Sequence, residues 1–131
     1  MRQLSPDGRF EIHSHRRDDD SYMYSDTDYD WWISCVESGD ELASFSGSSY
    51  QRAGSSTEEG VRSVAFDGDF VVGTRYDGQV ERVELPARWQ ISADRSHITL
   101  SYRDGRAETR ERRSVIATGK FGDAFALTKL K

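Results

Sequence analysis

An acidic and aromatic segment, Asp18 to Glu41, holds many of the side chains of this 131-residue chain that could bind or react. It contains nine Asp or Glu residues, no Lys or Arg, and five aromatic residues. Carboxylates steer a basic partner toward the surface, and Tyr and Trp supply contact area at low entropic cost. The same carboxylates repel nucleic-acid phosphates. The segment therefore predicts a surface that binds a basic protein and makes no direct contact with nucleic acid.

Within this segment we expect the partner to be bound by Tyr24, Asp26, Asp28, Tyr29, Asp30 and Trp32. The aspartates would meet Lys or Arg, and the aromatic side chains would serve as anchors. Trp31 is assigned to the core instead, because it alternates with Ile33 and Cys35. The alternative interpretation is a solvated surface that pairs internally with Arg103–Arg113, where five arginines stand beside three acids.

The spacing of Asp26, Asp28, Asp30 and Glu37 also matches a set of metal ligands. Counted from Asp26, these acids occupy positions 1, 3, 5 and 12, which resembles the calcium-binding loop of EF-hand proteins. Position 6 of that loop requires glycine, and this chain has Trp31 there, inside an expected strand. The tryptophan at position 6 argues against an EF-hand. The hypothesis that remains is a calcium site of another geometry, formed by the oxygen atoms of Asp26, Asp28 and Asp30.

A second candidate metal site consists of Glu11, His13 and His15, which share one face if the segment is a strand. This spacing occurs in zinc and iron sites and resembles the first motif of the cupin family. Asp19 or Asp20 stands where that family has its glutamate, and no second cupin motif follows. The alternative is an ordinary polar surface. We expect no cofactor.

Catalysis has little support in the sequence. Cys35 lies in an expected strand with no adjacent cation to activate it, so we expect an inert core thiol. Nucleophile-elbow, Walker and dinucleotide motifs are absent from the sequence. The main hypothesis is a non-enzymatic protein-binding domain, for which an inhibitor or a toxin-neutralising, immunity-like protein is one example. The alternative is a β-scaffold that binds calcium, zinc or a small apolar ligand.

Length and composition indicate a folded single domain, 1–131. Hydrophobic residues make up 35% of the chain, 15 residues are aromatic and the net charge is −5, which argues against disorder. A single cysteine fits a reducing compartment, and neither a membrane span nor a signal peptide is evident. We therefore expect a cytoplasmic protein that does not associate with a membrane.

Asp-Gly pairs predict the turns of the fold. Asp67-Gly68 and Asp77-Gly78 predict a central three-stranded meander over residues 61–85. Two-residue turns would place on its buried face Val61, Ala65, Phe70, Val72, Val83 and Leu85. Asp104-Gly105 predicts a further hairpin, with Tyr102 opposite Ala107 and a polar second strand at a sheet edge.

Further strands are expected around Phe10–Ile12, Trp31–Cys35 and Leu42–Ser46, whereas the Gly/Ser-rich segment 46–60 is expected to be a mobile loop. The C-terminus suits either a short helix from Asp123 through Leu130 or a last strand. No segment holds a helical period over three turns. The fold class is therefore all-β, an antiparallel β-sandwich or flattened β-barrel of about seven to nine short strands. An exposed edge strand would also permit a homo-oligomer.

Overall fold

The computed structural model describes residues 2–21, 24–52, 54–117 and 125–129, which form twelve strands. The strands are β1 (Arg2–Leu4), β2 (Phe10–Ser21), β3 (Tyr24–Cys35), β4 (Glu41–Arg52), β5 (Ser55–Asp67), β6 (Phe70–Arg75), β7 (Val80–Glu84), β8 (Arg88–Ile91), β9 (His97–Ser101), β10 (Ala107–Glu111), β11 (Arg113–Ala117) and β12 (Phe125–Lys129). The all-β class is thus confirmed, with more strands than expected and several long ones. The described residues include no helix with the length and apolarity needed to cross a membrane.

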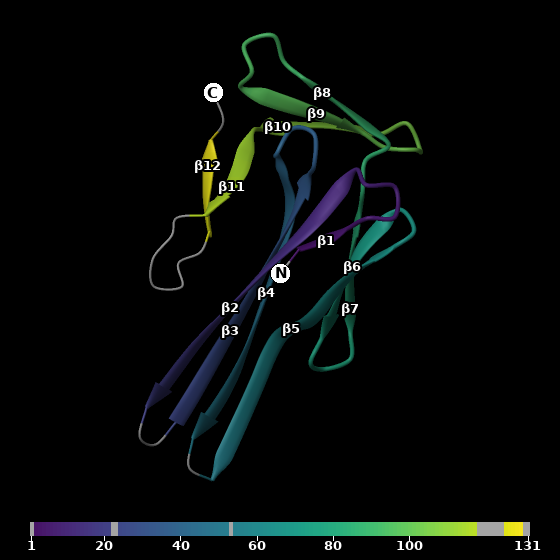
Figure 1. The fold of residues 1–131 in the computed structure, drawn as a ribbon. Helices are drawn as coiled ribbons and strands as arrows, with labels where there is room; N and C mark the ends of the chain where they lie inside the picture. The colour runs from purple at the N-terminus through teal and green to yellow at the C-terminus, as the bar shows by residue number, and fades with distance from the viewer. Residues whose placement is uncertain (1, 22–23, 53, 118–124, 130–131) are drawn as a thin grey trace.

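The main sheet has seven antiparallel strands in the order β1-β2-β3-β4-β5-β6-β7, so each strand pairs with its neighbours in the chain (Figure 1). A three-stranded sheet has the order β10-β9-β8, and β11 pairs with β12. In the described residues the outer strands β1 and β7 pair with no strand that would close the sheet. The flattened barrel was therefore a wrong expectation, whereas the central meander β5-β6-β7 is confirmed.

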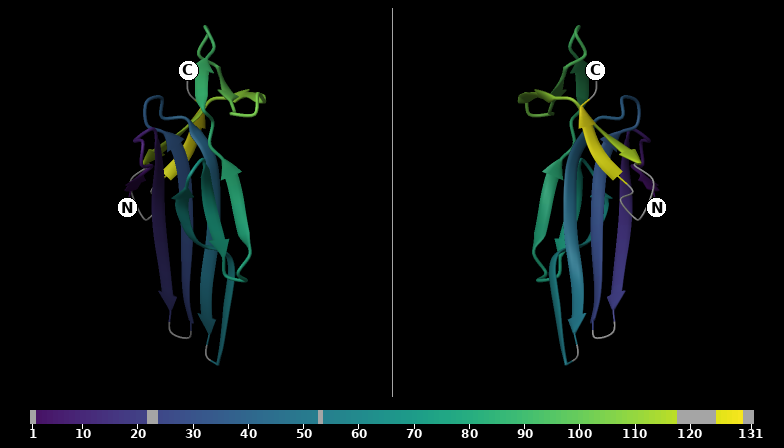
Figure 2. Two further views of the ribbon diagram at one scale, coloured as in Figure 1. Left: turned by 90° about the vertical axis from the view of Figure 1, so that its right-hand side faces the viewer. Right: turned by 90° about the vertical axis from the view of Figure 1, so that its left-hand side faces the viewer.

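Four strands of the main sheet extend well beyond the rest of the molecule (Figures 1 and 2). We call this extension the arm and define it as residues 14–21 of β2, 24–30 of β3, 46–52 of β4 and 55–60 of β5. The expectation of a mobile loop over residues 46–60 was wrong, because residues 47–52 of β4 pair with residues 55–60 of β5. Its sequence lacked an apolar alternation because neither face of the arm is buried, and its Ser, Thr and Tyr residues suit exposed strands.

Two glycines allow the backbones of β4 and β5 to approach closely where the arm meets the core. A Cβ atom at Gly47 would clash with the carbonyl oxygen of Val61, and one at Gly60 would lie 2.6 Å from that of Ser46. Gly60 also has φ +78°, which L side chains rarely adopt. Beyond the Gly47–Gly60 pair, β5 separates from β4 and pairs with β6 from Val61 onward.

The hydrophobic core lies at the end of the main sheet opposite the arm. The expected alternation of Trp31, Ile33 and Cys35 is confirmed, since all three are buried. The three-stranded sheet adds Ile98 and Leu100, each 1% exposed. The other buried hydrophobic residues are Phe10, Ile12, Leu42, Phe45, Val61, Val71 and Leu85. The small sheet therefore covers the core end and leaves the arm without a covering layer.

The buried face of the meander differs from the expected one. Val71 is fully buried and pairs with Val83, whereas the two-residue turns had placed Val72 opposite Val83. The connection around Asp77-Gly78 is longer than two residues, because the Arg75 amide donates to the Gln79 carbonyl. A shift of one residue exchanges the two faces of a strand.

The register across the first turn of the meander was also wrong. Ala65 pairs with Val72, and Asp67 pairs with Phe70, so the turn residues are Gly68 and Asp69. Val61 and Leu85 are buried as expected. Ala65 is exposed, and Phe70 and Val72 are half-buried.

The hairpin at Asp104-Gly105 forms, with β10 at the edge of its sheet as expected. Its register is one residue from the expected one, because Ala107 pairs with Ser101. At the C-terminus the strand alternative is confirmed by β12. Asp123, the expected start of a helix, lies outside the described residues.

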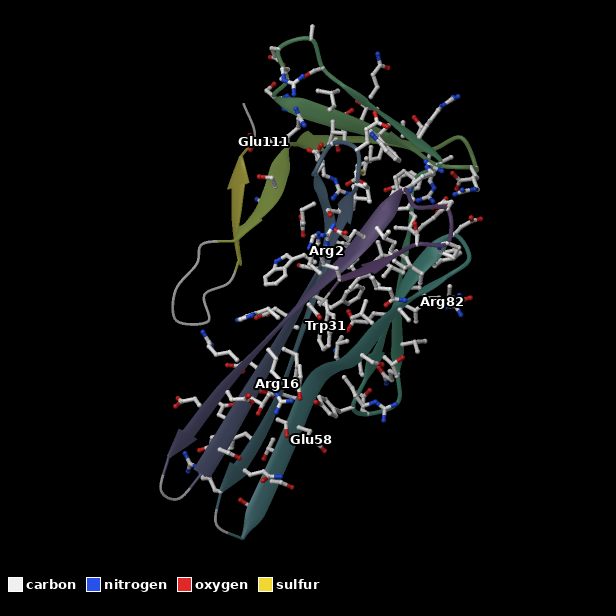
Figure 3. The ribbon with its side chains drawn as sticks, viewed as in Figure 1. Arg2, Arg16, Trp31, Glu58, Arg82 and Glu111 are labelled. Carbon is white, nitrogen blue, oxygen red and sulfur yellow. The ribbon has the colours of Figure 1, made fainter. Side chains whose placement is uncertain are left out.

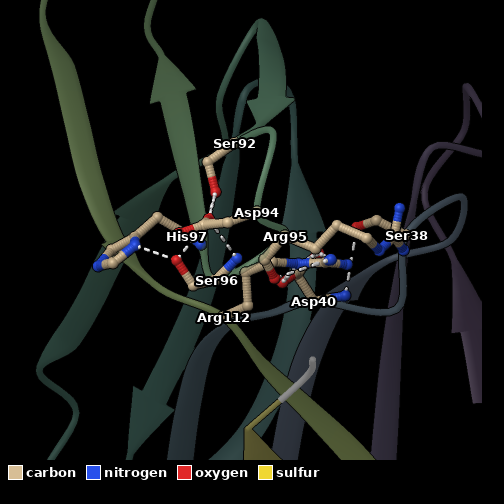
Figure 4. A network of polar contacts seen from close by, with 8 residues as sticks. All are labelled: Ser38, Asp40, Ser92, Asp94, Arg95, Ser96, His97 and Arg112. Carbon is tan, nitrogen blue, oxygen red and sulfur yellow. Dashed lines mark hydrogen bonds and ion pairs between the residues drawn. The ribbon is translucent and has the colours of Figure 1, made fainter.

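A buried ion pair joins the small sheet to the turn between β3 and β4 (Figure 4). Arg112 Nε donates to Asp40 Oδ1 and Nη2 to Oδ2, both at 3.1 Å. Both side chains are almost inaccessible to solvent, at 2% and 1% exposure. Arg112 Nη1 also reaches the carbonyl of Arg95, a residue with φ 63°. Charged groups buried this deeply require mutual pairing, so the contact fixes two distant segments together.

Candidate functional site

The acidic residues of β3 line one face of the arm. Asp26, Asp28 and Asp30 alternate along the strand, so their side chains point to the same side as Trp32. The same side receives Asp19 of β2 and Glu59 of β5 through the strand registers. We call the five carboxylates Asp19, Asp26, Asp28, Asp30 and Glu59 the carboxylate face. Four of the six expected contact residues are therefore brought together on one side of β3.

The remaining two expected residues differ. Tyr29 points to the opposite face, where its ring stacks on Trp31 at a centroid distance of 5.8 Å and packs against the core. Neighbouring residues of a strand point to opposite sides, so the ring of Tyr29 lies on the other face of β3 from the carboxylates of Asp28 and Asp30, although Tyr29 lines the same cleft, and its role in partner binding stays a prediction. Tyr24 begins β3 and pairs with Arg52, and its side chain lies outside the described part of the structure.

An open cleft of about 490 Å³ lies on this side of the arm. It is lined by Arg17, Asp28, Asp30, Ser48, Glu59 and Arg75, among others. Arg17 donates to Asp28 at 2.9 Å across the β2–β3 pair. Burial, followed by the charge of Asp28, raises the pKa of Asp30. In this cleft Asp28 is therefore paired with an arginine, whereas Asp30 and Glu59 have no Lys or Arg within 4.0 Å among the described residues.

Five carboxylates of the arm have no Lys or Arg within 4.0 Å among the described residues: Asp19, Asp26, Asp30, Glu58 and Glu59. Asp19 and Asp26 even face each other directly across β2 and β3. Figure 3 shows Glu58 on the outer strand of the arm, apart from Arg82. Directly opposed like charges destabilise a sheet, so the fold itself gains nothing from this arrangement.

The arginine-rich segment meets the acidic segment at its C-terminal end, where Arg112 pairs with Asp40, and its other paired arginines contact acids outside the arm. Arg103 pairs with Asp69 at 3.3 Å, and Arg110 pairs with Glu108 at 2.8 Å. Arg106 contacts Glu84 and Asp104. Within the acidic segment, Asp40 does have an arginine of this group as its partner, Arg112.

The two candidate metal sites gain no support from the geometry. Among the described residues, no group of three His, Cys, Asp or Glu side chains is arranged to hold a metal ion. Side chains that alternate along one strand, such as Asp26, Asp28 and Asp30, lie in a row and do not converge.

In the second candidate site, Glu11 forms an ion pair with Arg2 Nη2 at 2.5 Å and lies 2.8 Å from His13 Nε2. Burial lowers the pKa of His13. His15 lies farther along β2, opposite Asp30. The structure therefore accounts for Glu11 as a buried ion-pair acceptor.

Cys35 is buried at 1% exposure, and burial raises its pKa to about 12. The thiolate is the reactive form, so this thiol is poorly suited to nucleophilic chemistry. The expectation of a core thiol is confirmed.

Glu58 and Glu59 were missed by sequence reasoning because they fall in the segment expected to be a loop. Their position within a paired strand carries no apolar signal, and only the neighbouring Ser and Thr residues favour a strand.

Comparison of the chain with models of protein families, with curated proteins and with solved structures gave no match.

Proposed function

We propose that this chain is a non-enzymatic protein-binding domain, and that the carboxylate face of the arm contacts a basic surface of a partner protein. One observation carries the proposal: among the described residues, four of the five carboxylates on this face, Asp19, Asp26, Asp30 and Glu59, have no Lys or Arg within 4.0 Å, and only Asp28 pairs with an arginine. Arginine or lysine side chains of a partner would supply the missing charges. Such contacts increase the association rate and reject acidic partners.

The position of Trp32 supports this proposal. Its side chain is half-buried and lies on the same side of β3 as the three aspartates. An aromatic anchor beside charged groups is a common arrangement in protein interfaces. An inhibitor or toxin-neutralising protein is one class that would use such a surface.

We further propose a sandwich-like scaffold for this surface. The ring of Phe45 on β4 lies against Gly73 on β6, where an added Cβ atom would come within 2.8 Å of Cδ1. Two parts of one bent sheet would then face each other across the core and hold the arm in place.

Affinity capture tests the proposed function. The bait would be the wild-type chain beside the triple variant Asp26→Asn, Asp28→Asn and Asp30→Asn, with a lysate washed at low and high salt. We expect a basic protein to be retained by the wild type at low salt and lost with the triple variant, because salt screens exposed charges.

A matched control neutralises three acids elsewhere, Asp67→Asn, Glu81→Gln and Glu84→Gln. This variant changes the net charge equally and should retain the partner. Circular dichroism would establish that both variants remain folded. Equal retention by the wild type and the folded β3 triple variant would refute the proposed function.

A further inference from the structure

The outer edge of β5 within the arm has no strand beside it in the described structure. Residues 55–60 pair with β4 on one side, and pairing with β6 begins only at Val61. The amide of Tyr76 donates to the Gly60 carbonyl at 3.1 Å, and this contact marks the end of the covered part of the edge. The outward N–H and C=O groups between Ser55 and Glu59 are therefore placed to pair with an added strand.

This edge lacks the usual devices that prevent such pairing. Natural edge strands often carry lysine, proline or a bulge. The segment Ser55–Glu59 contains neither lysine nor proline, and its register with β4 continues without a shift. Its only charged side chains are Glu58 and Glu59, which point to opposite faces, are exposed and have no Lys or Arg within 4.0 Å among the described residues. The edge is thus regular, exposed and acidic.

The other edge of the arm differs in charge. On β2, Arg16 Nε contacts Asp18 at 3.1 Å, and Arg17 contacts Asp28 at 2.9 Å. These arginines would repel a basic strand, whereas the glutamates of β5 would attract one. A second copy of the chain would fit β5 less well, because Ser55–Glu59 contains no Lys or Arg that could contact the glutamates of the other copy.

We propose that an extended, basic segment of the partner adds to the edge of β5 as a further strand of the arm. Its backbone would pair with Ser55–Glu59, and its Lys or Arg side chains would contact Glu58 on one face and Glu59 on the other. This inference rests on the proposed function, since it specifies which part of the basic partner binds and how.

The probe for the test is a fluorescein-labelled nine-residue peptide of alternating Lys and Thr, added to the full chain and followed by fluorescence anisotropy. A control peptide has the same side chains and methylated amide nitrogens, so it keeps its charge but donates no backbone hydrogen bonds. We expect methylation to weaken binding by about tenfold or more, because several backbone bonds are lost together. Hydrogen exchange should show new protection at residues 55–59.

Two charge-matched double variants locate the contact. We expect Glu58→Gln with Glu59→Gln to weaken peptide binding several-fold more than Asp19→Asn with Asp26→Asn, which removes two charges near the opposite edge. Equal binding of the two peptides, or equal effects of the two double variants, would overturn the strand addition while leaving the carboxylate face as the binding surface. No binding of the unmodified peptide would also overturn the strand addition, and the affinity capture above would then decide the proposed function separately.

Discussion

Between Val61 and Arg110 all eight Asp and Glu side chains have a polar partner, whereas five carboxylates of the arm have no Lys or Arg within 4.0 Å among the described residues. In the first region seven of these acids pair with arginine, and Asp94 accepts hydrogen bonds from Ser92 and Ser96. None of the acids compared is buried in either region, so exposure alone does not explain the difference. The charges of the second half thus pair within the fold, whereas those of the arm are the ones we propose for contact with a partner.

The largest effect should come from the buried pair that serves the fold. Arg112→Met would leave the Asp40 carboxylate buried and uncompensated, and we expect a loss of about 3–5 kcal/mol in the free energy of unfolding. The double variant Asp40→Leu with Arg112→Met should recover most of that loss. Urea denaturation measures both.

The exposed variant Glu108→Gln is the control for that prediction, since it removes one partner of the Arg110 pair. We expect it to change stability by at most about 1 kcal/mol. If Arg112→Met costs no more than Glu108→Gln, the buried pair does not hold the two segments together.

A smaller effect of opposite sign is expected for the arm. Asp26→Asn should raise the free energy of unfolding by about 0.2–1 kcal/mol, because Asp19 lies directly across the strand pair. Asp69→Asn should lower it by at most about 1 kcal/mol, because Arg103 loses its partner. Both differences should shrink when denaturation is repeated at high salt. The same sign for both variants would contradict the distinction between the two regions.

The smallest effect concerns pH. Burial raises the pKa of Asp30 above its unfolded value of about 3.9, so its charge disfavours the folded state at neutral pH. Asp30→Asn should therefore melt above the wild type at pH 7. The difference should decline as pH falls through the raised pKa and be gone near the unfolded value.

Glu108 should behave in the opposite way, because a hydrogen bond from Arg110 lowers its pKa. Glu108→Gln should melt below the wild type at pH 7. That difference should be full above the unfolded pKa of about 4.3 and disappear as pH falls through the lowered folded value. Thermal melts across this range would show whether the two carboxylates differ in sign.

The sequence predicted those parts of the fold in which one face is buried. Trp31, Ile33 and Cys35 alternate with more exposed residues or small polar ones, and this alternation placed β3 correctly. Residues 46–60 gave no such signal because both faces of the arm are open, although residues 47–52 pair with residues 55–60. Asp26, Asp28, Asp30 and Trp32 lie two residues apart along β3 and so share one side, whereas placing Tyr29 required knowing which face is covered; their role in binding stays a prediction.

Long-range pairs were beyond sequence reasoning. Asp40 and Arg112 are 72 residues apart, and nothing in either neighbourhood identifies the other as its partner. The meander failed for a different reason, since its turns were located but the length of the connection at Asp77-Gly78 was not. One additional residue in a turn shifts the register, so that Val71 pairs with Val83 and is buried where Val72 was expected.

The consecutive order of the seven strands has a consequence for how the chain folds. Each strand pairs with the one made just before it, so the main sheet can grow hairpin by hairpin and closes only short loops at every step. Such local topology favours fast folding compared with other β-proteins. The Asp40–Arg112 contact is the exception, because it closes a loop of 72 residues. We therefore expect it to form late, after the hairpins, and to act mainly on the rate at which the finished molecule unfolds.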